Sequence, residues 1–188
     1  MPDNIDYKFL SDLEGGSKTI GYVPAANVSK SGVTIGTGFD LGQRSEADLK
    51  RLKLTVALIN KLKPYLGNKG KAAADLIKKK PLTINAAEAK SIDKAVKSAH
   101  VTSLKTKYAA SLHNKAKKDF FNLPAEAQTV VASVSFQYGV NLDTAAPKFW
   151  KSASAQDWKE TVKVLKSFGD AYPTRRKKEA ALLEKIVK

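Results

Sequence analysis

The chain has 188 residues, of which 43% are hydrophobic and 27% charged, a balance typical of a folded chain with a sizeable core rather than a disordered one. It carries 33 Lys and Arg against 18 Asp and Glu, a formal net charge of +15, and no cysteine. Disulfides, thiolate metal sites and cysteine nucleophiles are therefore excluded. The positive charge attracts polyanions such as nucleic acid, anionic membranes and anionic cell wall, but lysines are spread along the whole chain and single out none of them.

The N-terminal part predicts a short helix followed by strands. The segment "PDNIDYKFLSDLEGG" has apolar residues at helical spacing, a cap in Asp3 or Asn4, and a stop at Gly15, so Glu14 falls at the helix C-terminus. Residues 17–42 mix β-branched and aromatic residues with glycine, which predicts a β-hairpin or three-stranded ribbon. The start lacks the pattern of a signal peptide, and no stretch approaches the roughly 18 apolar residues of a membrane span.

The remaining sequence predicts helices. Ser45–Asp48 is a capping box before an apolar face that runs from Leu49 to Ile59, and Asn85–Glu88 caps a helix that a separate one over 101–118 should follow. The segment "AQTVVASVSFQYG" is apolar nearly all round, which predicts a buried central helix ended by Gly139.

These elements predict an α+β, mostly helical fold organised as a single domain over residues 1–188. We expect an N-terminal lobe over 1–66, with the β-ribbon and a connecting helix, packed beside a helical lobe over 67–188.

Few residues could perform chemistry. His100 and His113 stand in basic segments without a carboxylate at ligand spacing, so no metal site is expected. The segment "GTGFDLG" lacks the glycine spacing of a dinucleotide site, and no cofactor is expected either.

Glu14, Thr34 and Asp40 form the remaining constellation. At a helix C-terminus the macrodipole favours the protonated carboxyl that a general acid needs, unless Glu14 is paired. Thr34 and Asp40 share a strand face by parity, but a straight strand would part them by roughly 20 Å, so Gly36 and Gly38 would have to supply a bend. An ordinary structural role is also open to each: a fraying helix end, a strand residue and a loop cap.

The motifs "LEGG" and "GVTIGTGFDLG" together resemble the phage lysozyme (muramidase) family, most closely its pesticin-like members. The resemblance continues through "PLTINAAEAKSIDKAV", "VASVSFQYGV" and "YPTRRKKEAALL", so it covers essentially the whole chain. It implies a lysozyme-like fold and an enzyme that hydrolyses the β-1,4 bond between N-acetylmuramic acid and N-acetylglucosamine in bacterial peptidoglycan, without a cofactor.

The resemblance also implies roles for the constellation. Glu14 would be the general acid, and Thr34 would hold the attacking water. Many phage lysozymes place a second catalytic carboxylate or a cysteine between these two, but residues 15–33 contain no Asp, Glu or Cys. Asp40 is therefore the candidate for the base or for electrostatic support of the transition state, and an inverting or a retaining outcome stays open.

Four further residues would face the substrate or the acid. Gly38 is a place where the backbone can approach the glycan closely, and Phe136 and Gln137 match the family's residues beside the sugar cleft. Arg175 matches the arginine that pairs with the catalytic glutamate, with Arg176 as an exposed companion. Gln137 has an alternative role as a polar residue of a buried helix that the backbone satisfies.

A second hypothesis is a non-catalytic cationic antibacterial protein that binds nucleic acid or membrane. It rests on the charge of +15 and on the basic C-terminal helix "RRKKEAALLEKIVK". For the enzyme we expect a monomer that acts on the periplasmic cell wall, that has no nucleic-acid partner, and whose basic helix helps it at an anionic outer membrane. As a phage endolysin it would stay in the host cytoplasm until holin release; otherwise it would be delivered as an effector or bacteriocin.

Overall fold

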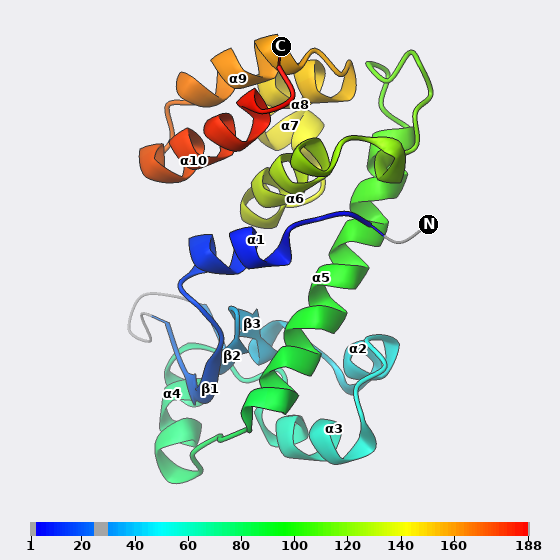
Figure 1. Cartoon of the computed structure of the whole chain (residues 1–188). Coiled ribbons are helices and arrows are strands. Elements are labelled where there is room, and N and C mark those ends of the chain that lie inside the picture. Colours follow the sequence, from blue (N-terminus) through cyan, green and yellow to red (C-terminus); the bar gives the residue numbers. More distant parts are fainter. Residues whose placement is uncertain (1–2, 25–29, 188) are drawn as a thin grey trace. The chain divides into compact units, whose positions relative to one another are not determined.

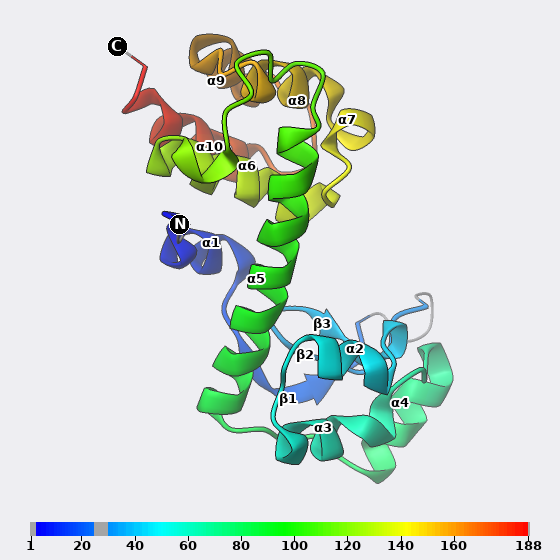
Figure 2. The same cartoon turned by 90° about the vertical axis from the view of Figure 1, so that its right-hand side faces the viewer.

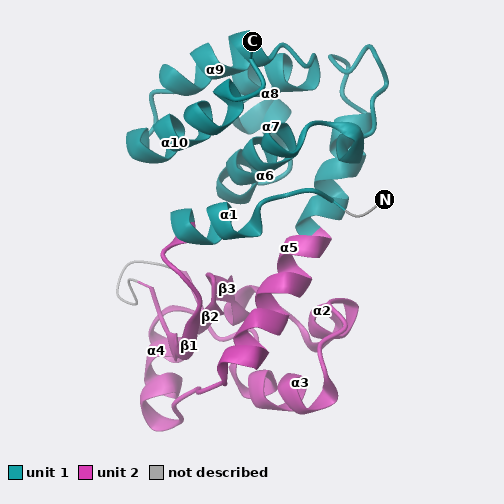
Figure 3. Ribbon diagram, in the orientation of Figure 1, with its two compact units in different colours: residues 1–13, 100–188 teal, residues 14–99 magenta. Residues whose placement is uncertain are grey.

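The computed structural model describes residues 3–24 and 30–187 and is shown in Figure 1. The chain forms two compact units, unit 1 with residues 1–13 and 100–188 and unit 2 with residues 14–99 (Figure 3). These boundaries differ from the division at 66/67 expected from the sequence. They differ because helices α1 (Tyr7–Glu14) and α5 (Ala86–Ala109) each contribute residues to both units.

Unit 2 contains a small antiparallel sheet in the order β1-β2-β3, which confirms the predicted ribbon. An apolar core that includes the fully buried Ile35, Leu49 and Ile92 joins the sheet to the helices. The elements of unit 2 besides the parts of α1 and α5 are β1 (Lys18–Tyr22), β2 (Thr34–Gly36), β3 (Phe39–Asp40), η1 (Leu41–Gln43), α2 (Glu46–Arg51), α3 (Val56–Leu62), η2 (Lys63–Tyr65) and α4 (Gly70–Lys79).

The capping box at Ser45 is confirmed, but the helix after it is shorter than predicted. Ser45 and Asp48 exchange the two hydrogen bonds of the box at the start of α2. The backbone then adopts a positive φ of 55° at Lys53, and Thr55 caps a new helix, α3. Val56, predicted to face the core, is therefore 74% exposed.

Helix α5 is one continuous helix of 24 residues where the sequence predicted two (Figure 2). Asn85 and Glu88 form the predicted capping box at its start. No glycine or proline interrupts residues 86–109, so nothing in the backbone requires the helix to end before Ala109.

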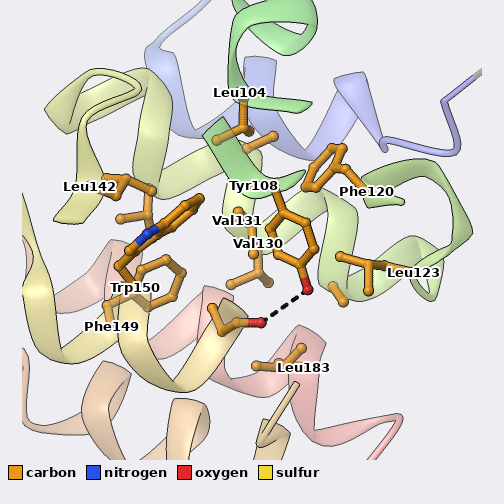
Figure 4. Close-up of a cluster of buried hydrophobic side chains, with 14 of the residues drawn as sticks. Leu104, Tyr108, Phe120, Leu123, Val130, Val131, Leu142, Phe149, Trp150 and Leu183 are labelled. Atoms are coloured by element: carbon orange, nitrogen blue, oxygen red, sulfur yellow. Dashed lines mark hydrogen bonds between the residues drawn. The ribbon is translucent and has the colours of Figure 1, made fainter. Parts of the chain in front are cut away.

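Unit 1 is built around the predicted central helix. Helix α6 (Ala125–Tyr138) is buried without a break from Ala127 to Ser135, and Gly139 ends it with a φ of +83°. The core of unit 1 contains large aromatic side chains (Figure 4), and the Tyr108 hydroxyl donates a hydrogen bond to the Ala153 carbonyl oxygen at 3.4 Å. The other elements are η3 (Phe120–Asn122), α7 (Leu142–Ala145), α8 (Pro147–Ser154), α9 (Trp158–Lys166) and α10 (Pro173–Glu184).

Asn4 and Asp6 are hydrogen-bonded to α6. The Asn4 amide donates to Gln128 Oε1 at 3.0 Å and the Asp6 amide to Thr129 Oγ1 at 2.9 Å. Asp6 also accepts a hydrogen bond from the Phe9 amide in the first turn of α1, a capping role that the sequence assigned to Asp3 or Asn4. These contacts join segments of unit 1 that lie far apart in the sequence.

Helix α10 buries the apolar side chains that made it look like a membrane-binding helix. Ala180 and Leu183 are buried in the core of unit 1, and the helix packs against α9 and α6. Lys177 and Lys178 remain exposed. Among the described residues, no helix combines the length and the apolar character needed to cross a bilayer.

Candidate active site

The β2–β3 hairpin brings Thr34 and Asp40 together. The two residues are direct partners in the antiparallel register of β2 and β3. Gly36, the last residue of β2, has a φ of +61° and Gly38, in the turn before β3, has a φ of +82°, values that L-residues with a side chain rarely adopt. The prediction that these glycines fold Asp40 back onto Thr34 is therefore confirmed.

Asp40 also has the structural role that the sequence left open. Its Oδ1 accepts hydrogen bonds from the amides of Gly32 at 2.9 Å and Gly42 at 2.8 Å. The two glycines lie against each other, since a Cβ built on Gly32 would come within 2.4 Å of the Gly42 Cα. One carboxylate oxygen thus joins two closely packed segments, and the orientation of the Asp40 side chain is fixed.

Thr34 is 3% exposed, and its Oγ1 donates a hydrogen bond to the Gly32 carbonyl oxygen at 3.2 Å. Because the hydroxyl proton is used in this bond, its oxygen lone pairs are oriented to accept from another group such as a water.

Glu14 is the last residue of α1, as predicted, and its partner is a lysine. Its Oε2 lies 3.4 Å from Lys97 Nζ of α5, and the side chains of Glu14 and Lys97 are 18% and 12% exposed. This Oε2 is itself buried and, among the described residues, has no partner of hydrogen-bond geometry. Within unit 2 the partner of Glu14 is thus Lys97, which the sequence had not singled out.

Asp93, one turn before Lys97 on α5, holds the tip of the hairpin. Its Oδ1 accepts the Thr37 amide at 2.7 Å, and a Cβ built on Gly36 would meet the same oxygen at 2.7 Å. Neither Asp93 nor Lys97 was predicted as a site residue from the sequence. Their spacing of four residues, which places them on one helix face, was visible in the sequence but is common on any helix.

Gln137, Phe136 and Arg175 belong to unit 1. The side-chain oxygen of Gln137 accepts a hydrogen bond from Arg176, which leaves the amide nitrogen able to donate. Arg176 was expected to be exposed but is 3% exposed, because it also forms an ion pair with Asp170 at 3.1 Å. The backbone role considered for Gln137 is therefore replaced by a side-chain partner.

Arg175 and Phe136 have partners within unit 1. Arg175 donates to Glu179 Oε1 at 3.2 Å and to Ser133 Oγ at 3.0 Å. Burial raises the pKa of the Glu179 carboxyl, and the neighbouring guanidinium groups oppose that rise. The Phe136 ring stacks on His100 with 4.4 Å between ring centroids, and burial lowers the pKa of this histidine.

The histidines do not gather with other ligands. Among the residues that the structure describes, no three His, Asp or Glu side chains come together in the way that the ligands of a metal ion do.

Comparison with protein-family models shows to which family the chain is related. Residues 4–159 match the pesticin family, described as a bacterial toxin homologue of phage lysozyme, C-terminal part. The chain belongs to this family. A search of curated proteins found no match.

The match to the pesticin family contains Glu14, Thr34, Asp40 and the end of α6, whereas Arg175 lies beyond it. Membership supports a lysozyme-type peptidoglycan hydrolase, and the mostly helical fold with its small antiparallel sheet agrees with a lysozyme-like α+β architecture.

Proposed function

We propose that the protein is a muramidase that cleaves the β-1,4 bond between N-acetylmuramic acid and N-acetylglucosamine. The observation that carries this proposal is the register pairing of Thr34 with Asp40 in a member of the pesticin family. A hydroxyl and a carboxylate on neighbouring strands are the two groups needed to hold and deprotonate one water molecule. Glu14, on a different element of the same unit, supplies the acid.

In the proposed reaction Glu14 donates its proton to the glycosidic oxygen as the bond to the sugar carbon breaks. The electron pair of that bond passes to the leaving oxygen, and positive charge develops on the sugar ring. Thr34 Oγ1 accepts a hydrogen bond from the water, and Asp40 takes up the water proton as the new C–O bond forms. The two amides on Asp40 Oδ1 hold the carboxylate in place, so its Oδ2 is the oxygen assigned to the water.

Four further residues are proposed to bind the glycan. A Cβ built on Gly38 would meet no atom within 4 Å, so space beside the hairpin tip is open to a sugar ring. Gln137, with its oxygen held by Arg176, presents its amide nitrogen as a donor. Phe136, the preceding residue of α6, supplies an apolar ring that is stacked on His100. The ion pair with Glu179 fixes the position of the Arg175 side chain.

Replacement of Glu14 tests the proposal directly. Glu14→Gln keeps the shape of the side chain and removes the transferable proton, and we expect the rate to fall by about 10²- to 10⁴-fold. The assay is the release of reducing ends from purified peptidoglycan, with mass spectrometry to identify the bond and early NMR to identify the anomer. Glu160→Gln, at an exposed ion pair with Lys163, is the matched control. A Glu14→Gln protein that hydrolyses at the wild-type rate refutes the assignment.

The site of action and the route to it remain proposals. We propose the periplasmic cell wall as the target, reached as a phage endolysin or as a delivered toxin, and the toxin description of the family adds weight to the second route. Truncation of α10 cannot test an outer-membrane role, because it removes the buried Ala180 and Leu183. Replacement of the exposed Lys177, Lys178 and Lys185 by Gln leaves this core intact; loss of killing of intact cells, with unchanged hydrolysis of purified peptidoglycan, would support such a role.

A further inference from the structure

Helix α5 presents two charged side chains to two different parts of the proposed site. Asp93 accepts the amide of Thr37 in the hairpin turn at 2.7 Å, and Lys97 lies 3.4 Å from Glu14 Oε2. Residues four apart on a helix lie on one face, about 6 Å apart along the axis. All these groups belong to unit 2, so each contact is made within one compact body.

The Lys97–Glu14 pair is more shielded than the other lysine ion pairs among the residues that the structure describes. The Lys8–Asp12 and Lys71–Asp75 pairs have lysine side chains that are 83% and 87% exposed, whereas Lys97 is 12% exposed and Glu14 18%. Exposed pairs of this kind contribute little to stability, but a shielded ammonium acts on its neighbour through less water. Lysines are almost never buried unless they are paired.

The Asp93 contact is matched by the sequence of the turn it holds. Any side chain at Gly36 would place its Cβ 2.7 Å from Asp93 Oδ1, closer than real contacts allow. The turn can therefore approach α5 this closely only with glycine at that position. Thr37 then donates its amide to the same oxygen, which fixes the hairpin that carries Thr34 and Asp40.

We propose that Asp93 and Lys97 are the positioning residues of the hydrolase, a role that rests on the muramidase function proposed above. Lys97 holds the Glu14 carboxyl and stabilises the negative charge that develops on it as its proton passes to the glycosidic oxygen. Asp93 fixes the hairpin that holds the water. Because both side chains project from one rigid turn of α5, that turn sets the spacing between the acid and the water-binding pair.

The role of Lys97 is tested by charge removal. Lys97→Met keeps the length of the side chain, and we expect kcat to fall by about 10- to 100-fold with little change in KM, because charge stabilisation in the transition state is lost. Lys97→Arg should retain most of the rate, and Lys94→Met, at an exposed position of the same helix, should match the wild type. A Lys97→Met enzyme with wild-type kcat overturns the proposal.

A second measurement separates positioning from folding. If Lys97 acts through Glu14, adding Lys97→Met to Glu14→Gln should lower the residual rate no further; an additional loss of the full 10- to 100-fold refutes the coupling. Lys97→Gln serves as a second charge-removing variant, and failure of both to fold overturns a positioning role in favour of a structural one. If Glu14→Gln is fully active, the proposed muramidase mechanism is wrong. If Glu14→Gln is inactive but Lys97→Met is fully active, only the positioning role of Lys97 is wrong.

The role of Asp93 is tested by removing the oxygen that accepts the Thr37 hydrogen bond. Asp93→Ala removes the partner of the Thr37 amide, and we expect kcat to fall about tenfold. Asp93→Asn keeps an acceptor oxygen and should restore most of the rate at an unchanged KM. Equal rates for the alanine variant and the wild type, measured on folded protein, would show that the turn does not need Asp93.

Discussion

Asp40 has one role that the structure shows and one that is proposed, and a pair of substitutions can separate them. Its Oδ1 accepts hydrogen bonds from the amides of Gly32 and Gly42 at 2.9 and 2.8 Å, and its pairing with Thr34 supports the proposed role as the base that deprotonates the water. Asp40→Ala removes both hydrogen bonds and the proposed base. Asp40→Asn keeps an oxygen that accepts both amide hydrogen bonds and removes only the negative charge, so it tests the proposed catalytic role with little change in the structural one.

The magnitudes follow from the two bonds. A hydrogen bond to a charged group contributes about 1.5–3 kcal/mol, and because Asp40 is partly exposed we use the lower end, about 3 kcal/mol for the pair. In a chain of this size the loss of about 3 kcal/mol in Asp40→Ala should lower Tm by about 6–12 °C. Asp40→Asn should lower the free energy of unfolding by about 1 kcal/mol and Tm by about 2–4 °C. Both variants should lose about 100-fold or more of the hydrolysis rate.

The assay measures Tm by calorimetry and reducing-end release on the same preparations, at a temperature where each variant is folded. Two results refute the reasoning in different ways. If Asp40→Asn hydrolyses at the wild-type rate, Asp40 is not the base and Thr34 alone positions the water. If Asp40→Ala and Asp40→Asn have equal Tm values, the amide bonds to Oδ1 do not stabilise the fold.

Three further predictions concern stability. Gly36→Ala should destabilise the protein by about 2–4 kcal/mol, because the positive φ and the contact with Asp93 add, whereas Gly38→Ala, which meets open space, should cost about 1–2 kcal/mol; urea denaturation compares them. Phe120→Ala, at a fully buried ring, should cost about 3–5 kcal/mol, and a loss below 1 kcal/mol in the same experiment would contradict its place in the core. Burial lowers the pKa of His100 in the folded state, so on acidification the unfolded chain binds a proton at this histidine before the folded chain does. The free energy of unfolding should therefore fall as the pH drops from about 6.5 towards the lowered pKa. Thermal unfolding at a series of pH values measures this fall, and His100→Phe should lose this part of the pH dependence.

Features that depend on nearby residues could be predicted from the sequence. The capping boxes at Ser45 and Asn85 and the end of α6 at Gly139 each arise from a few adjacent residues, and all three are confirmed. Continuity of α5 could not be predicted in the same way, because its middle is a weak local pattern and the helix is held by the cores of both units. Val56 was misplaced because a turn at Lys53 changed the phase of its helix face.

The candidate site shows the same division between local and distant information. The pairing of Thr34 with Asp40 could be predicted because parity and two glycines lie within one short segment. The partners of Glu14 and of the hairpin turn could not, since Lys97 and Asp93 are separated from them by most of unit 2. The resemblance implied an arginine partner for Glu14, and the fold adds a lysine partner within unit 2.

The hydrogen bonds from Asn4 and Asp6 to α6 have a consequence for the order of folding. They join residues 124 and 123 positions apart, and the whole of unit 2 lies between them. Unit 2 is continuous in sequence and can collapse on nearby contacts, whereas unit 1 must close this long loop after α6 has been synthesised. During translation Asn4 and Asp6 leave the ribosome before α6 but can dock only after it, and we expect their amides to gain protection from hydrogen exchange later than those of the β-ribbon.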